Sequence, residues 1–240
     1  MGMFYSSDPY KEEGLFRPED VSNYYGDKFY LVGADFWRKQ EKSNAGMLDG
    51  FTYTHDTDIT FSRAILDRQV KGHNLGNQHC AEFGAGIGRI TKNLLIEYFQ
   101  EIDLIDPVKE FLDFAQKDFG DRVKLNLYPI GAQEWKATTK YDCFWIQWTL
   151  MYLTDDDAIK LLKDCKNHLK RYGKIFVKEN GFPNDPDKSL AYWNPDDHSF
   201  ARSHESYLAL FEKAGLTVVE NLLQPDWGED LLPLYAFVLR

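Results

Sequence analysis

The sequence predicts an α/β protein with a seven-stranded, mostly parallel sheet and an N-terminal helical and lid extension. Apolar runs of strand length alternate with segments of helical periodicity from residue 79 onward, which is typical of parallel sheets covered on both faces. Glycines at alternate positions, Gly84, Gly86 and Gly88, join the first apolar run to a helix-like segment. The last two apolar runs are separated only by residues 224–232, so we expect them to pair antiparallel.

The N-terminal part of the chain has a different pattern. Residues 1–28 are rich in Tyr, Asp, Glu and Pro with little periodicity, and we expect a partly ordered extension there. Residues 29–240 form the main domain, in which helices are predicted over Phe29–Gln40 and Ile59–Val70. The segment between them, residues 41–58, is punctuated by Asn and Gly and predicts a loop that folds over a site. We call this segment the lid.

The remaining elements follow from the same periodicities. Thr154 before three aspartates indicates a helix start, and Gly173 after Lys170 and Arg171 indicates a helix end. Helices are predicted near 88–99, 107–118, 155–171 and 203–214. Strands are predicted near 79–84, 101–106, 123–128, 142–148, 174–179, 217–223 and 234–239.

Composition narrows the class of protein. The 240 residues suit one domain, and a net charge of −10 disfavours a nucleic-acid backbone as the main partner. No apolar run is long enough to span a membrane. Cys80, Cys143 and Cys165 lie in apolar or helical contexts without metal-like spacing, so we expect no metal site and a reduced, cytoplasmic or nuclear location. No obligate protein partner is indicated.

The glycine-rich turn predicts a nucleoside site. Its spacing is G-x-G-x-G, and Arg89 occupies the place of the third glycine of a dinucleotide-binding motif. Asp106 ends the next predicted strand and can accept hydrogen bonds from both hydroxyls of a ribose. With the acidic Glu82 in front of it, this turn resembles motif I of S-adenosylmethionine (SAM) methyltransferases.

Other polar residues lie at the carboxyl ends of predicted strands, where ligands bind in such sheets. We expect Gln133 to bond the adenine edge and Gln147 the amino-acid end of the cofactor, with Arg89 pairing with its carboxylate. The alternative for Gln133 is that it caps the next turn. The alternative for Arg89 is that it covers the helix surface.

Several motifs that lie apart in the sequence resemble one protein family more specifically than the glycine-rich turn alone does. They are Phe36–Gln40 with Gly46–Gly50, then Gly84–Lys92, Trp145–Trp148 and Val177–Asn180. Together they resemble the protein N-terminal α-N-methyltransferases, which methylate the α-amine of proteins beginning X-Pro-Lys. The resemblance covers roughly residues 30–240 and implies a Rossmann-like fold, SAM as the cofactor and the N-terminal tails of proteins as substrates.

The resemblance also implies roles for individual residues. Cofactor contacts are implied at Gly84, Arg89, Asp106, Gln133 and Gln147, and we assign Gly86, Pro107, Val108 and Ala132 in the same turns to the cofactor as well. The substrate channel has Trp37 and Trp148 as walls, Leu48 from the lid, and Asn180 to fix the peptide. Asp197 matches the catalytic acidic residue of the family, and Ser199 matches a nearby peptide contact.

Two positions depart from the family pattern. Tyr152 stands where the family usually has a histidine implicated in proton chemistry, and Asn194 stands where an aspartate usually helps to receive the substrate lysine. We therefore predict Asp197 as the proton acceptor, with Asn180 as a hydrogen-bond partner at the reacting amine, whereas Tyr152 orients groups or packs the channel wall. His198 and His204 are alternative bases, disfavoured because His198 lies in a polar loop and His204 at a helix start.

Two other functions stay open from the sequence. A small-molecule methyltransferase uses the same fold, and only the lid and loop motifs speak against it. A non-catalytic binder of protein N-termini is the second, and the replacement at Tyr152 is its one sequence hint. Methylation of nucleic acid is disfavoured by the negative charge and the lack of basic patches.

Overall fold

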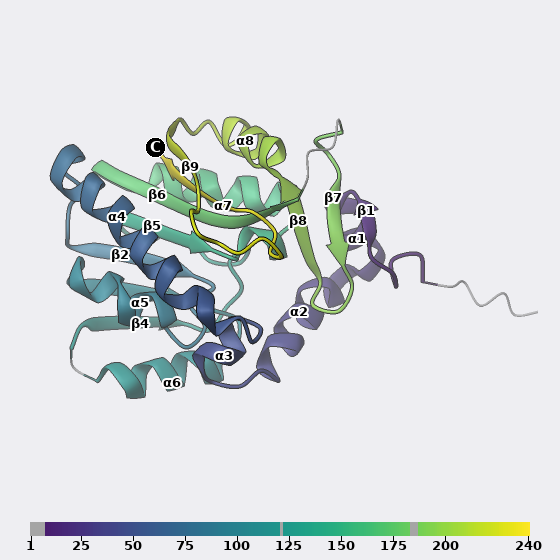
Figure 1. Cartoon of the computed structure of the whole chain (residues 1–240), viewed down its shortest axis with the longest axis horizontal. Coiled ribbons are helices and arrows are strands. Elements are labelled where there is room, and N and C mark those ends of the chain that lie inside the picture. The colour runs from purple at the N-terminus through teal and green to yellow at the C-terminus, as the bar shows by residue number, and fades with distance from the viewer. Residues whose placement is uncertain (1–7, 121, 183–186) are drawn as a thin grey trace, which may run out of the picture.

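The computed structural model describes residues 8–120, 122–182 and 187–240. Its centre is a seven-stranded sheet in the order β4-β3-β2-β5-β6-β10-β9 (Figure 1). The first five strands in this order are parallel, and β10 runs antiparallel to both of its neighbours. The predicted fold class is therefore confirmed. The strands are β2 His79–Phe83, β3 Glu101–Ile105, β4 Lys124–Tyr128, β5 Tyr141–Gln147, β6 Leu169–Phe182, β9 Val218–Leu223 and β10 Leu234–Leu239.

Helices bury both faces of this sheet. Successive residues of β5 point into different apolar clusters: Phe144 packs with α7 and α8, and Trp145 packs with α4, α5 and α6. This alternation explains why the strands read as continuous apolar runs. The helices are α4 His55–His73, α5 Arg89–Asn93, α6 Lys109–Phe119, α7 Asp155–Asn167 and α8 His204–Lys213.

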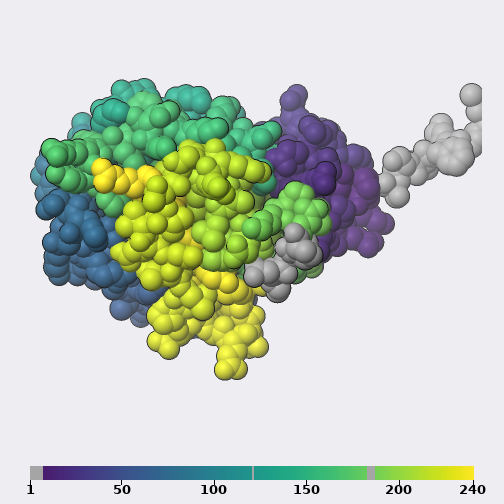
Figure 2. Space-filling model, turned by 90° about the horizontal axis from the view of Figure 1, so that it is seen from above, coloured from purple at the N-terminus to yellow at the C-terminus, as the bar shows by residue number. Residues whose placement is uncertain are grey.

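Three short strands extend the sheet from the end of β6. They are β1 Gly14–Phe16, β7 Ala191–Asn194 and β8 Ser199–Ser203. They pack with α1 Pro18–Tyr25 and α2 Phe29–Arg38 around a core that contains Phe29 and Trp193. In Figure 2 the purple N-terminal elements lie against the green segment that contains β7. No strand was predicted from the sequence for these segments. The part of the predicted N-terminal extension that covers residues 1–7 lies outside the described residues.

Several predicted boundaries were wrong. The predicted lid loop contains α3 Asn44–Met47 and a 3₁₀ turn, η2 Thr52–Thr54, and its last residues already belong to α4. The Ser43 side chain caps α3 by accepting a hydrogen bond from the Gly46 N–H at 3.2 Å. The helix predicted over 155–171 ends at Asn167, because the chain joins β6 from Leu169. The helix predicted over 88–99 breaks after Asn93 into the 3₁₀ turn η3 Leu95–Glu97.

The remaining 3₁₀ turns are η1 Gly26–Lys28, between α1 and α2, and η4 Leu150–Tyr152, after β5. Among the described residues, no helix combines the length and apolar character needed to cross a membrane.

Candidate active site

A cavity of about 780 Å³ opens at the carboxyl ends of the parallel strands. The helix α2, the lid, and the turns after β2, β3, β4 and β5 all contribute to its wall. The structure thus brings together almost every residue that the sequence analysis assigned to a site. These are Trp37, Leu48, Gly84, Gly86, Arg89, Asp106, Pro107, Val108, Ala132, Gln133, Gln147, Trp148, Tyr152, Asn180, Asn194 and Asp197.

One end of the cavity is built on the glycine-rich turn. The Gly86 N–H donates to Asp106 Oδ2 at 2.9 Å, and the Val108 N–H donates to Asp106 Oδ1 at 2.8 Å. Gly86 has φ +54°, and an added Cβ would lie only 2.9 Å from Met47 Sδ of the lid. Burial raises the pKa of Asp106 to about 6, although both backbone bonds oppose the shift. A fixed carboxylate beside bare backbone suits the hydroxyls of a ribose.

A buried ionic network lies beside this end. Asp58, in the first turn of α4, accepts hydrogen bonds from Arg89 Nη2 at 2.7 Å, from Gln147 Nε2 at 3.0 Å to each oxygen, and from Lys178 Nζ. Burial alone would raise the pKa of Asp58, but the charges of Lys178 and Arg89 outweigh it and hold this pKa below its usual value. Arg89 and Gln147 are therefore held in place by one carboxylate.

Asp58 and Lys178 were not predicted as site residues from the sequence. Asp58 falls in the last residues of the lid segment, and its partners come from three other parts of the chain. An aspartate in the first turn of a helix reads as an ordinary charge that favours the helix dipole, so no local pattern marked it.

Asp197 and Tyr152 lie in contact on another part of the wall. The Tyr152 hydroxyl donates to Asp197 Oδ2 at 3.1 Å, and the Trp37 ring packs edge-on against Tyr152. Burial raises the pKa of Asp197, although the bonds from Ser199 and Tyr152 oppose this shift. Burial also raises the pKa of Tyr152 well above its ordinary value, so its phenol stays neutral and donates.

Ser199 is the one assigned site residue that does not line the cavity. It is buried behind Asp197, and both its hydroxyl and its N–H donate to Asp197 Oδ1, at 2.7 and 3.1 Å. Its side chain therefore supports the Asp197 carboxylate, and a peptide contact at Ser199 stays a prediction. Asn194 lines the cavity, but its side-chain oxygen accepts a hydrogen bond from the Asp196 N–H at 3.0 Å, as in an Asx turn.

Trp148 and Asn180 connect the cavity to the β9–β10 connection. The Trp148 Nε1–H donates to Asn180 Oδ1 at 2.6 Å, and Asn180 Nδ2 donates to the Leu232 carbonyl at 3.2 Å. Trp148 has φ +50°, a strained backbone for a bulky residue, and such strain often marks functional sites. The ring centroids of Trp148 and Trp227 lie 6.3 Å apart.

The β9–β10 connection was not assigned to the site from sequence. It lines the cavity with Trp227, Asp230, Leu231 and Leu232. Figure 2 shows the yellow C-terminal part of the chain projecting from the surface of the molecule. The sequence signal that could have indicated this connection is a tryptophan with several acidic residues in a glycine-containing loop.

The two histidines considered as alternative bases lie elsewhere. His198 is buried among the rings of Tyr25, Phe29 and Trp193, and its Nδ1 lies 3.0 Å from the Phe29 carbonyl oxygen. Its pKa is lowered by burial. His204 Nε2 lies 3.0 Å from Asn221 Oδ1 on the neighbouring strand. Neither histidine lines the cavity, which agrees with the low rank that the sequence analysis gave them.

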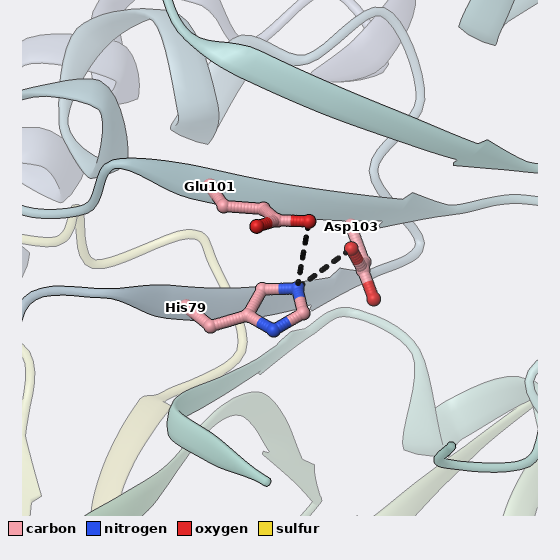
Figure 3. Close-up of side chains that lie close together, drawn as sticks. All are labelled: His79, Glu101 and Asp103. Carbon is pink, nitrogen blue, oxygen red and sulfur yellow. Dashed lines mark hydrogen bonds and ion pairs between the residues drawn. The ribbon is translucent and has the colours of Figure 1, made fainter. Parts of the chain in front are cut away.

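A polar cluster of His79, Glu101 and Asp103 lies at the opposite, amino end of β2 and β3 (Figure 3). His79 Nε2 is 2.8 Å from Asp103 Oδ1 and 4.0 Å from Glu101 Oε1. Donors already surround both carboxylates, since Asn126 Nδ2 reaches each of them and the Tyr141 hydroxyl reaches Asp103. Lys124 pairs with Glu101 at 2.7 Å. These bonds explain the cluster as a polar network within the sheet.

The order of the seven strands, the antiparallel last strand, and the glycine turn facing a strand-end carboxylate define the class of SAM-dependent methyltransferases. Within this class, the chain belongs to the family described as AdoMet dependent proline di-methyltransferase, whose model matches residues 26–240. The family resemblance seen in the sequence is thereby confirmed.

Individual relatives agree with this placement. The alpha N-terminal protein methyltransferase 1 of Dictyostelium discoideum is 32% identical over 229 residues, covering 92% of this chain and 83% of that protein. The N-terminal Xaa-Pro-Lys N-methyltransferase 1 of Danio rerio is 33% identical, with 88% and 95% covered. A solved structure from Leishmania major, a SAM-dependent methyltransferase, superposes with a TM-score of 0.83 at 31% identity, covering 93% of this chain and 91% of that one.

Proposed function

We propose that this protein transfers methyl groups from SAM to the α-amine of protein N-termini of the X-Pro-Lys type. One cavity joins the nucleoside end, at Gly86 and Asp106, to the Asp197 carboxylate and to Asn180. This continuity supports the proposal most directly, because a donor and an acceptor held in one cavity react as an oriented pair. The names of the relatives point to the same substrate class.

The donor end fits SAM. Asp106 keeps lone pairs for ribose hydroxyls while two backbone N–H groups hold it, and Gln133 lies among the lining residues at the turn after β4. Arg89 suits the carboxylate of the amino-acid part. SAM supplies an electrophilic methyl group when it is bound there.

The acceptor end suits an α-amine. An α-amine has a pKa of about 8, against about 10.4 for a lysine side chain, so a weak base suffices to keep it neutral near pH 7. We assign the role of proton acceptor to Asp197, with the neutral Tyr152 hydroxyl orienting the carboxylate. The nitrogen lone pair forms the new N–C bond as the C–S bond breaks, and the proton leaves to Asp197.

Aromatic walls suit the first two residues of such a tail. Trp37 and Trp148 both line the cavity, and aromatic faces attract cations and pack well on a proline ring. The Asn180 carboxamide, held by Trp148 and Leu232, faces the same space and can fix the peptide backbone.

The test is a transfer assay with SAM and an X-Pro-Lys peptide, read by mass spectrometry. We expect a mass increase of one or more methyl groups at the free terminus. The control is the same peptide with an acetylated terminus, which should stay unchanged. Methylation of the acetylated peptide at its lysine, or of small amines alone, would refute the proposal.

A peptide-binding titration distinguishes the proposed enzyme from a non-catalytic binder of protein N-termini. Peptide affinity without any transfer, with SAM shown to bind, would establish a binder of N-termini in place of an enzyme.

A further inference from the structure

Lys178 is buried in β6, close to the cofactor end of the cavity but not among the residues that line it. Its Nζ donates to Asp58 Oδ1, to the Asp58 carbonyl at 3.2 Å and to Ser62 Oγ at 2.9 Å. Three acceptors match the three N–H bonds of an ammonium group, whereas a neutral amine has only two. The ring of Phe61 lies 5.4 Å from the same nitrogen. Burial lowers the pKa of Lys178, and the Asp58 carboxylate opposes this shift. The three acceptors around Nζ favour the charged ammonium form.

Arg89 shares Asp58 with Lys178. Arg89 Nη2 donates to Asp58 Oδ2 at 2.7 Å, and Nη1 lies 3.3 Å from His55 Nδ1. Burial and the charge of Arg89 both lower the pKa of His55, so this imidazole is a neutral acceptor. A guanidinium has five N–H donors, so Arg89, which lines the cavity and lies over the Trp148 ring, keeps donors for a ligand.

The network therefore carries two cations and one anion. Lys178 and Arg89 are positive, Asp58 is negative, and His55 and Gln147 are neutral. Glu82 also faces Arg89, but burial raises its pKa to about 7 and its carboxyl is partly protonated at neutral pH. The excess positive charge lies in a site of low solvent exposure, where an unpaired charge is costly and a complementary ligand group is strongly favoured.

We propose that Lys178 is a positioning residue for the cofactor: by neutralising Asp58 it leaves the charge of Arg89 available to the carboxylate of the amino-acid part of SAM. This inference rests on SAM being the cofactor. Without Lys178, Asp58 takes the whole charge of Arg89 and the network becomes neutral. The nucleoside end, built on Asp106 and the glycine turn, is separate from this effect.

The test measures binding by calorimetry with two ligands that differ only in the amino-acid part. S-adenosylhomocysteine carries the carboxylate, and methylthioadenosine lacks the amino-acid part. In Lys178→Met we expect the Kd of S-adenosylhomocysteine to rise about tenfold, the scale of a lost charge-assisted hydrogen bond. The Kd of methylthioadenosine should change by less than about twofold, since its contacts lie at the nucleoside end.

A double variant distinguishes charge from packing. Asp58→Asn with Lys178→Met removes one anion and one cation, so Arg89 again supplies an excess positive charge. We expect S-adenosylhomocysteine affinity to return to within about threefold of the wild type. Lys174→Met is the matched control, because Lys174 is buried in the same strand and donates to the Tyr172 carbonyl outside the network. It should leave both affinities unchanged.

The binding results distinguish failure of this inference from failure of the proposed function. An unchanged S-adenosylhomocysteine affinity in Lys178→Met overturns the inference, as does a parallel loss for both ligands or a double variant that recovers nothing. Failure of the wild type to bind S-adenosylhomocysteine at all would instead overturn the proposed function.

Discussion

The phenol of Tyr152 donates a hydrogen bond to Asp197 Oδ2 at 3.1 Å, and the Ser199 hydroxyl donates to the other oxygen of the same carboxylate at 2.7 Å. Two neutral donors thus fix the orientation of one partly buried acid. The arrangement gives Tyr152 the role of orienting group, because burial raises the pKa of its phenol well above the ordinary value and excludes it as a base at neutral pH.

Tyr152→Phe should therefore reduce kcat only about three- to tenfold, the scale of one hydrogen bond to a charged group. Binding of S-adenosylhomocysteine should stay unchanged, because Asp106 and the glycine turn are not altered. Steady-state kinetics with an X-Pro-Lys peptide check this. A loss of three orders of magnitude or more would show that the phenol itself takes the proton.

Asp197→Asn should lower kcat by about 100-fold or more, the usual range for a removed general base. Cofactor binding, measured separately by calorimetry, should survive. Loss of cofactor binding in this variant would move Asp197 out of the role proposed for it.

The pH profile gives an independent check on Asp197. Its pKa is raised by burial, so the ionised base is present at high pH and is lost as the pH falls through that raised pKa. The wild-type kcat should therefore fall on the acid side. In Asp197→Asn this fall should disappear, whereas a rise toward about pH 8 from the free α-amine of the peptide should remain in kcat/KM.

The cofactor end should show its own pH dependence. The pKa of Asp106 is raised by burial to about 6, so the carboxylate is ionised above that pH and protonated below it. Affinity for S-adenosylhomocysteine should thus weaken as the pH falls through about 6, because a protonated carboxyl accepts ribose hydroxyls less well. Asp106→Asn should bind more weakly and lack this step. An identical step in the variant would assign it to another group, with Glu82 as the first candidate.

Much of the fold was predictable because its determinants are local. Several of the main strands, such as β5 and β10, are apolar runs, and Thr154 and the glycine turn marked helix starts directly. The short strands β1, β7 and β8 were not predictable in this way. They pair only with one another and with the end of β6, so their pairing depends on contacts far apart in the sequence.

The site residues also differ in how far the sequence could predict them. Gly86, Asp106 and Gln147 lie at strand ends, where the parallel topology gathers ligand-binding residues, and their place in the cavity follows from the fold class. Asp58 and Asp230 reach the site from a helix start and from a loop, so only the folded structure shows them there. Ser199 was assigned a peptide contact by resemblance, but it begins β8 and its side chain turns to Asp197.

The acceptor side of the cavity carries negative charge. Among the described residues that line it, Arg89 is the one basic side chain, and it lies at the cofactor end beside Asp58. Asp196 and Asp230 are exposed there, and neither carboxylate has a hydrogen bond or ion pair with any part of the chain that the structure describes. Asn194 is neutral, and its side-chain oxygen is engaged with the Asp196 N–H. These two carboxylates are therefore available to a substrate cation.

Asp230→Asn should reduce the preference for X-Pro-Lys over X-Pro-Gln peptides, measured as the ratio of kcat/KM values, by about two- to fivefold, the range for an exposed ion pair. Activity on the X-Pro-Gln peptide should be unchanged, because only the charge pairing is removed. Glu229→Gln is the matched control, since Glu229 is the neighbouring acid and does not line the cavity. An equal loss of preference in both variants would indicate a general field effect, and no loss in either would remove Asp230 from substrate selection.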